Sequence, residues 1–346
     1  MQRLLSVWLV ISVFILVFIS GCGSSNQAVF EIAGQTMGTT YRLTYTAGEN
    51  LNGELADQTT RLLDEINESL SPFIESSLIT RINSSRDTTE THAVDYHFGT
   101  VFKHAREIHD LTDGAFNPAL GPLIRAWGFG KDDSQSLDST RIDELLQLSS
   151  LDVFVLDEAN PPRLRKRLSE AELDFGAIAK GYAVDELGRL LESGGVTDYL
   201  VEIGGEVRAR GRHPEKRSWR VGIEKPLEAS RDFQVIVQLS DISMATSGNY
   251  RNFFWKDGRK VVHTINPFTG YPEDNSLLSV SVVARDCMTA DAFATAFMVL
   301  GIDATLDLIE RNGGPDVYLI SGGDETALET SISEGFSRII VADTDR

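Results

Sequence analysis

Cysteine is almost absent from this sequence of 346 residues, which contains only Cys22 and Cys287. Two cysteines cannot form a disulfide framework, so the fold has to rest on its hydrophobic core. Cys287 has no Cys or His neighbour at metal-site spacing, and we expect it to be a small apolar residue of the core. The 42% hydrophobic and 24% charged composition is that of an ordinary globular chain.

Basic residues are also scarce: 32 Lys and Arg stand against 51 Asp and Glu, for a formal net charge of −19. A surface of this charge repels phosphate backbones, which excludes general nucleic-acid binding but not a local pocket for an anionic cofactor. No Gly-x-Gly-x-x-Gly follows a predicted strand, so a Rossmann-type site is not supported. The Asp174-Phe175-Gly176 triplet lacks the other kinase motifs, which excludes a kinase.

The N-terminus has the pattern of a secretory signal. Arg3 precedes an apolar run from Leu4 to Ile19, and small residues lead to Cys22. The segment Ile-Ser-Gly-Cys resembles a bacterial lipobox, in which the cysteine is lipidated and becomes the mature N-terminus. We therefore expect a signal peptide at 1–21, a flexible tether at 22–30, and attachment to a bacterial cell membrane on its periplasmic or extracytoplasmic face. An uncleaved membrane anchor is the alternative, because the run is near the minimum length of a span.

After residue 30 the chain lacks Pro/Ser-rich linkers and internal repeats, so one domain is predicted over 31–346. Hydrophobic periodicity predicts an α+β fold with a mixed, mostly antiparallel sheet and packed helices. The predicted strands are 39–46, 153–157, 172–175, 199–204, 206–210, 219–224, 233–239, 261–266, 277–284, 316–321 and 337–342. The predicted helices are 54–70, 100–114, 141–148, 178–192, 290–300 and 303–311.

The segment TADAFATAFMVLG (289–301) places Asp291 and Thr295 four residues apart, on one face of a predicted helix. A carboxylate and a hydroxyl in this arrangement can supply two oxygen ligands to Mg²⁺. In the alternative interpretation Thr289 is an N-cap, Asp291 an acidic first-turn residue and Gly301 a C-terminal cap. The helix is otherwise apolar, and a buried Asp needs a partner or a metal.

In LDFGAIAKGYAVDEL (173–187) a short strand ends at Asp174 and a helix follows. Lys180 lies in the first helical turn, where the helix dipole disfavours a cation, so it either meets a phosphate or is exposed to solvent. Gly204-Gly205 between two strands predicts a hairpin turn or a close approach to a flat ligand. The segment 111–130 is rich in Gly, Pro and Asn, which suits an ordered loop lining the pocket of an aromatic ligand.

Only six histidines occur, and His263 lies where a β-branched run meets the turn Asn266-Pro267. Taken alone, this position favours a structural role. A histidine is nevertheless the side chain best matched to proton transfer near neutral pH. The histidines at 104 and 109 fall on a predicted helix and suit surface or packing positions.

Seven segments, in order, resemble the ApbE family, the FAD:protein FMN transferases, over about residues 30–342. They are GQTMGTTY (34–41), TDGAFNPALGPLIRAWGFG (112–130), LDFGAIAKGYAVD (173–185), VEIGGEVRARG (201–211), ATSGNYRNFF (245–254), HTINPFTGYP (263–272) and TADAFATA (289–296). The resemblance implies Mg²⁺-dependent transfer of FMN from FAD to a threonine of a target flavoprotein, with release of AMP. It also implies targets among subunits of sodium-pumping (NQR) or Rnf-type electron-transport complexes.

The same resemblance assigns roles to individual residues. It implies a metal held by Asp291, Thr295 and the backbone oxygen of Ala177. It implies a flavin pocket formed by Met37, Phe73, Ala115, Phe116, Asn117, Asp174, Lys180 and Ile265. Because a threonine hydroxyl needs a base to become a nucleophile, His263 is the candidate catalytic base. Two alternatives stay open at this point: hydrolysis of FAD to FMN and AMP, and a non-catalytic flavin-binding lipoprotein.

Overall fold

The structure is a computed structural model that describes residues 28–129, 137–227, 232–249, 253–256, 259–322 and 328–342. The expected signal peptide and Cys22 lie outside these residues. Among the described residues the first strand begins at Ala28, which pairs with Ala47, so residues 28–30 of the expected tether belong to a strand.

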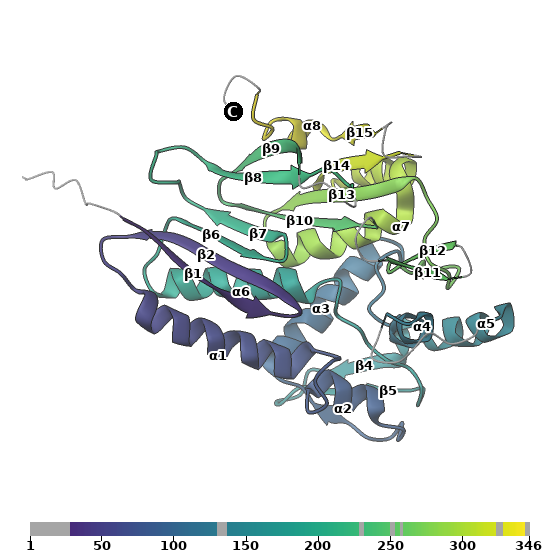
Figure 1. The fold of residues 1–346 in the computed structure, drawn as a ribbon. Coiled ribbons are helices and arrows are strands. Elements are labelled where there is room, and N and C mark those ends of the chain that lie inside the picture. The colour runs from purple at the N-terminus through teal and green to yellow at the C-terminus, as the bar shows by residue number, and fades with distance from the viewer. Residues whose placement is uncertain are drawn as a thin grey trace, which may run out of the picture.

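An eight-stranded sheet forms the centre of the molecule, in the order β1-β2-β6-β7-β10-β13-β14-β15 (Figure 1). Each neighbouring pair in it is antiparallel. Its strands are β1 (Ala28–Thr36), β2 (Thr39–Ala47), β6 (Tyr199–Ile203), β7 (Glu206–Arg210), β10 (Ile242–Gly248), β13 (Leu277–Ala284), β14 (Asp316–Ser321) and β15 (Glu329–Ile332). The predicted α+β class and mostly antiparallel sheet are confirmed.

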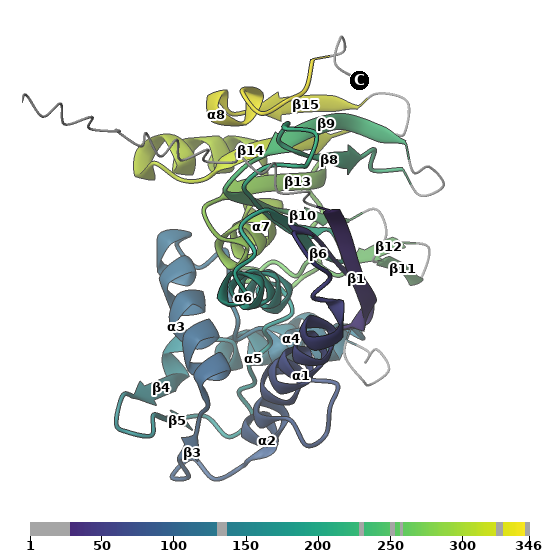
Figure 2. The same ribbon diagram turned by 90° about the vertical axis from the view of Figure 1, so that its left-hand side faces the viewer.

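Two helices, α6 (Ala179–Ser193) and α7 (Cys287–Asn312), pack side by side against one face of this sheet (Figure 2). α6 lies under β6 and β7, and α7 lies under β10 and β13. Their outer sides are covered by α1 (Asn52–Leu70) and α3 (Tyr96–Leu111), with α2 (Leu78–Ser84) next to α1. This arrangement explains why the part of α7 that precedes Gly301 is apolar nearly all round: that part is a helix of the core.

By length and composition α7 could also cross a membrane, but half of its most apolar window is buried inside the protein. It is interrupted at Gly301, whose φ of 75° and ψ of −177° are not helical. The predicted pair of helices at 290–300 and 303–311 therefore corresponds to two segments joined at this glycine.

The other face of the sheet is covered by the hairpin of β8 (Trp219–Glu224) and β9 (Phe233–Leu239) together with the short helix α8 (Glu334–Ser337). These elements enclose a second apolar cluster that includes Val237, Tyr318 and Phe336. The strand predicted at 337–342 is wrong in part, because residues 334–337 are helical. Beyond them, Ile339 O accepts from Gln238 N and Val341 N donates to Ile236 O, along the edge of β9.

The remaining elements are smaller. They are α4 (Gly121–Trp127), α5 (Ser139–Leu148), η1 (Leu151–Val153), the ladder of β3 (His92–Ala93), β5 (Arg163–Lys166) and β4 (Phe154–Asp157), and the pair β11 (Phe253–Lys256) and β12 (Arg259–Val262). The strand predicted at 172–175 is wrong. Its backbone bonds go elsewhere: Leu173 N donates to the Asn83 side chain and Asp174 N to Pro118 O.

Candidate active site

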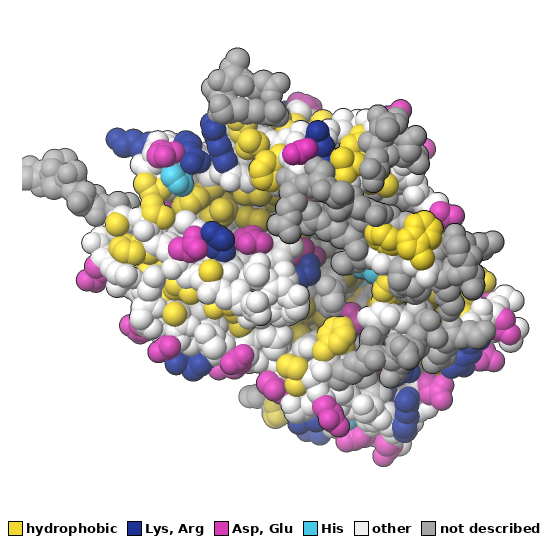
Figure 3. All heavy atoms as spheres, in the orientation of Figure 1, with side chains coloured by type: hydrophobic (Ala, Val, Ile, Leu, Met, Phe, Trp, Pro, Cys, Tyr) yellow, Lys and Arg dark blue, Asp and Glu magenta, His cyan; other side chains and the backbone are white. Residues whose placement is uncertain are grey.

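One cavity of about 740 Å³ gathers residues from several distant segments of the chain. Its walls come from the loop before α4, the start of α6, the β6–β7 turn, the end of β10, the segment after β12, and α7. The cavity is lined by these residues of the sequence-predicted site: Phe73, Ala115, Phe116, Asn117, Asp174, Ala177, Lys180, His263, Ile265, Asp291 and Thr295. On the face shown in Figure 3, acidic and basic side chains are interspersed with hydrophobic ones.

Met37 is not among the residues that line this cavity. It lies in the turn between β1 and β2, with a positive φ of 50°, and is partly buried against the main core. The segment 111–130 does line the cavity, but it is not only a loop, since Gly121–Trp127 forms α4.

Asp291 and Thr295 lie in the N-terminal half of α7. The helix begins at Cys287, and Asp286 is its N-cap, with its side chain accepting from Thr289 N. Asp291 is therefore beyond the first turn and Thr289 is not the cap, so those parts of the alternative interpretation are wrong. Thr289 instead bonds through its hydroxyl to His104 Nε2, at 2.9 Å.

Asp291 is 3% exposed, and its Oδ2 accepts from Gly181 N at 2.9 Å. Burial raises the pKa of this carboxyl, while nearby Lys180 opposes the rise. One helical turn further on, Thr295 Oγ1 lies 3.3 Å from Ser247 Oγ on β10. Both the Asp291 carboxylate and the Thr295 hydroxyl thus belong to the cavity wall, one helical turn apart on α7. Within the described part of the chain, no group of three or more His, Cys, Asp or Glu side chains is arranged to bind a metal ion.

Lys180 is not simply exposed to solvent. Its Nζ lies 2.5 Å from Oε1 of Glu206, the first residue of β7, and both side chains line the cavity. Burial disfavours the ammonium, but the Glu206 and Asp291 carboxylates more than compensate and raise the pKa of Lys180. Burial also raises the pKa of Glu206. The Lys180–Glu206 pair was not predicted, since only the fold brings the start of α6 to the start of β7.

Asp174 ends an extended segment and shapes the turn before α6. Its Oδ1 accepts from Gly176 N at 2.7 Å, and burial raises its pKa. Ala177 follows in the same turn and lines the cavity. Gly204 and Gly205 form the turn between β6 and β7, and both have positive φ values (61° and 107°), as the hairpin interpretation requires.

His263 directly follows β12 and lines the cavity, with its ring 6.5 Å from the Phe129 ring, centroid to centroid. The next two residues hold the segment in place. The Thr264 hydroxyl donates a hydrogen bond to Asn249 Oδ1, and the buried Ile265 forms an isolated antiparallel β-bridge with Pro272. The strand predicted at 261–266 ends at Val262, so the histidine lies just past the strand, in the segment that leads to the turn. His109, in contrast, bonds to Phe116 O.

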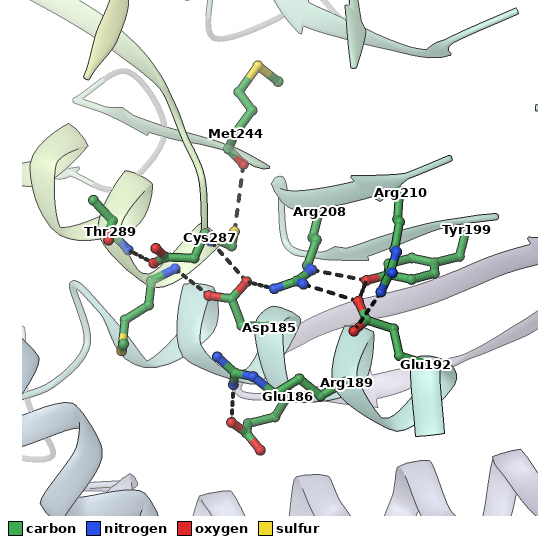
Figure 4. A network of polar contacts seen from close by, with 12 residues as sticks. Asp185, Glu186, Arg189, Glu192, Tyr199, Arg208, Arg210, Met244, Cys287 and Thr289 are labelled. Carbon is green, nitrogen blue, oxygen red and sulfur yellow. Dashed lines mark hydrogen bonds and ion pairs between the residues drawn. The ribbon is translucent and has the colours of Figure 1, made fainter. Parts of the chain in front are cut away.

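A largely buried polar network between α6, α7 and the sheet was not predicted from the sequence (Figure 4). The Asp185 side chain on α6 accepts from the backbone N–H groups of Cys287 and Met288, at 3.0 and 2.9 Å. Arg208 on β7 donates to Asp185 and, through Nε, to the Tyr199 hydroxyl. The network joins α6, α7 and the sheet, so it fixes the start of the helix that carries Asp291. Asp185 and Arg208 are far apart in the sequence, so no local pattern predicts that they pair.

Comparison with known proteins agrees with this arrangement. The model of the ApbE family matches residues 37–319. The FAD:protein FMN transferase of Vibrio cholerae is 36% identical over 323 residues, which are 92% of this chain and 94% of that protein. That of Escherichia coli (strain K12) is 31% identical over 337 residues, or 94% and 95% of the two chains.

Solved structures give the same result. The flavin transferase ApbE from Vibrio cholerae superposes with a TM-score of 0.81 at 33% identity, covering 90% of this chain and 99% of that one. The apo form of the Pseudomonas stutzeri flavinyl transferase ApbE gives a TM-score of 0.82 at 32% identity, with 91% and 98% coverage.

Proposed function

The chain belongs to the ApbE family, and on that premise we propose that it transfers FMN from FAD to a threonine hydroxyl of a target protein, releasing AMP. The observation that carries the proposal is the meeting of Asp291, Thr295, Lys180 and His263 in one cavity. A volume of about 740 Å³ falls within the range of cofactor sites.

The reaction exchanges the phosphoanhydride bond of FAD for a phosphoester bond to the threonine. The threonine oxygen forms a bond to the phosphorus of the FMN half, and the bond from that phosphorus to the bridging oxygen breaks. AMP leaves with the bridging oxygen, and the hydroxyl proton has to go to a base. His263 is the proposed base, because it lines the cavity and an imidazole accepts a proton near neutral pH.

The cavity offers groups for both parts of the substrate, one cation for the diphosphate and apolar side chains for the flavin. Lys180 offers an ammonium, and Phe73, Phe116 and Ile265 offer apolar surface for a flat ring. Developing negative charge on the phosphate oxygens is stabilised best by groups that are already in place.

We further propose that Asp291, Thr295 and the Ala177 carbonyl would hold Mg²⁺. The donor set fits this ion, since all three groups are hard oxygen ligands and Asp291 is a buried carboxylate. The small number of protein carboxylates also fits, because Mg²⁺ in phosphate sites keeps water and substrate oxygens as ligands. When bound, the ion would neutralise charge on the transferring phosphoryl group.

The test is to incubate the full-length chain with FAD, Mg²⁺ and a candidate target domain, and to measure flavin fluorescence on the denatured target band. A labelled band that requires Mg²⁺ is the expected result. Release of FMN and AMP without a label would indicate hydrolysis, and tight FAD binding without either product would indicate a binding protein.

We also propose a location and a class of target. Lipidation at Cys22 would hold the domain at the extracytoplasmic face of a bacterial membrane, next to membrane-bound acceptors such as subunits of NQR or Rnf-type complexes. The lipobox-like segment and the short polar stretch before Ala28 support the anchor. Cys22→Ser should move the protein from the membrane fraction to the soluble fraction. Retention of the variant in the membrane would favour an uncleaved anchor instead.

A further inference from the structure

Glu206 occupies an unusual position in the cavity wall. Its side chain is only 2% exposed, and one of its oxygens, Oε1, lies 2.5 Å from Lys180 Nζ. The other oxygen, Oε2, is buried and has no hydrogen-bond partner. An unsatisfied buried acceptor is destabilising. A charge pair that served only to stabilise the fold would be expected to satisfy both oxygens.

The backbone around Glu206 is held firmly. The residue directly follows the Gly204-Gly205 turn, and that turn is closed by Glu202, whose Oε1 accepts from Gly205 N at 2.9 Å. Behind it, β7 pairs with both β6 and β10 in the central sheet. The carboxylate therefore approaches the cavity from a rigid element, as a group that fixes another side chain should.

Lys180 is the residue that needs fixing. Its flexible four-carbon stem loses considerable rotamer freedom when the ammonium is held in one place. It lies in the first turn of α6, where the helix dipole repels a cation. Of the two carboxylates that stabilise this ammonium, Glu206 and Asp291, the carboxylate of Glu206 is the one that forms a hydrogen bond with it.

On the basis of the proposed function, we propose that Glu206 is a positioning residue, which orients the Lys180 ammonium toward the diphosphate of FAD. Glu206 itself acts through Lys180 and makes no essential contact with the substrate. The pairing sets the ammonium in place before FAD enters, so that the cost of ordering the side chain is met by folding rather than by catalysis.

The experiment is a double-mutant cycle on the full-length chain, with Glu206→Gln, Lys180→Met and the double variant. Glu31→Gln is the matched control, because Glu31 also pairs with a cation, Arg42, but in an exposed position that does not line the cavity. The measurements are kcat and KM for FAD, the Kd for FAD from flavin fluorescence, and the melting temperature.

We expect Glu206→Gln alone to lower kcat by on the order of 10- to 100-fold, with an unchanged melting temperature. In the Lys180→Met background we expect Glu206→Gln to cause no further fall in kcat, and Glu31→Gln should keep the wild-type rate. Glu206→Asn adds a shorter amide that cannot reach Lys180, and it should be at least as slow as Glu206→Gln.

A Glu206→Gln loss of the same size in the Lys180→Met background would overturn the proposal, because Glu206 would then act directly on the substrate. A parallel fall of kcat and melting temperature would also overturn it, since the pair would then be structural. If the wild type neither labels a target nor releases AMP, the proposed function fails. In that case the Kd values for FAD, measured for the same four proteins of the double-mutant cycle, still test the pairing. Glu206→Gln should change the Kd for FAD only when residue 180 is Lys.

Discussion

The Asp185 carboxylate on α6 lies 2.8 Å from the Arg208 guanidinium on β7, and both side chains are buried or nearly so. Burial raises the pKa of Asp185, an effect that its backbone hydrogen bonds and Arg208 oppose. The same carboxylate accepts the first N–H groups of α7. One ion pair therefore links the sheet, α6 and the helix that carries Asp291.

Removal of Arg208 should consequently destabilise the whole fold. We expect Arg208→Met to lower the free energy of unfolding by about 3 kcal/mol, because it leaves the buried Asp185 carboxylate without its counterion. Urea denaturation followed by circular dichroism measures the change. The neighbouring Arg210 pairs with Glu192 in a more exposed position, so Arg210→Met should cost less than about 1 kcal/mol. Equal costs for the two variants would contradict this interpretation of the network.

Gly181 allows α6 and α7 to approach each other closely. A Cβ added there would lie 2.3 Å from Cys287 O and 2.8 Å from Asp291 Cβ. Gly181→Ala should therefore destabilise the protein by roughly 1–3 kcal/mol or more and displace Asp291, which lowers turnover as well. At Gly99, within α3, an added Cβ would meet no other atom within 4 Å, so Gly99→Ala should stabilise the protein by up to about 1 kcal/mol. Thermal unfolding of both variants gives the comparison, and a stable, active Gly181→Ala protein would refute the close packing.

Asp291→Ala should abolish Mg²⁺-dependent turnover while FAD binding persists. A loss of at least about 100-fold is expected, because the variant lacks the one carboxylate proposed to hold the ion. Titration of Mg²⁺ into the FAD complex should show weaker binding in the same variant. Asp303 is exposed on the same helix and provides the control, since Asp303→Ala should behave as wild type. Full activity of Asp291→Ala would refute the metal assignment.

His263→Ala should slow transfer by about 100-fold or more and leave FAD bound, as expected for loss of a general base. Single-turnover transfer to the target, with the Kd for FAD measured in parallel, separates chemistry from binding. His213 lies on the opposite side of the sheet beside Trp219, and His213→Ala should retain the wild-type rate. An unchanged rate in His263→Ala would return this residue to a structural role.

Cys287 should be inert in the folded protein. The thiol is fully buried, and burial raises its pKa well above the usual value, so the reactive thiolate is scarce at pH 8. In a chain carrying Cys22→Ser, a thiol reagent should label no cysteine at pH 8 under native conditions and one cysteine in denaturant. Rapid labelling of the native protein would show that the start of α7 opens readily.

Much of this site could be predicted because its signals are local. The helical spacing of Asp291 and Thr295, the strand end at His263 and the glycine pair at 204 and 205 are each encoded within a few residues. The helix at 78–84 and the strands at 28–36 and 163–166 were not predicted. The helix and the strand at 163–166 are short and are fixed mainly by their neighbours, and the nine-residue strand at 28–36 is fixed by its pairing with β2. The strand predicted at 172–175 failed for the same reason: Asn83 and Pro118, far away in sequence, take its hydrogen bonds.

The sequence by itself determined the α+β class, the apolar character of α7 and the residue types available for chemistry, because composition and periodicity depend on local order along the chain. Only the tertiary structure decided which charges meet. It paired Lys180 with Glu206 and Asp185 with Arg208, and it placed Met37 outside the cavity that Phe73 and His263 share. These contacts join segments that are remote in sequence, and they exist only once α6 and α7 pack against the sheet and exclude water from the charges between them.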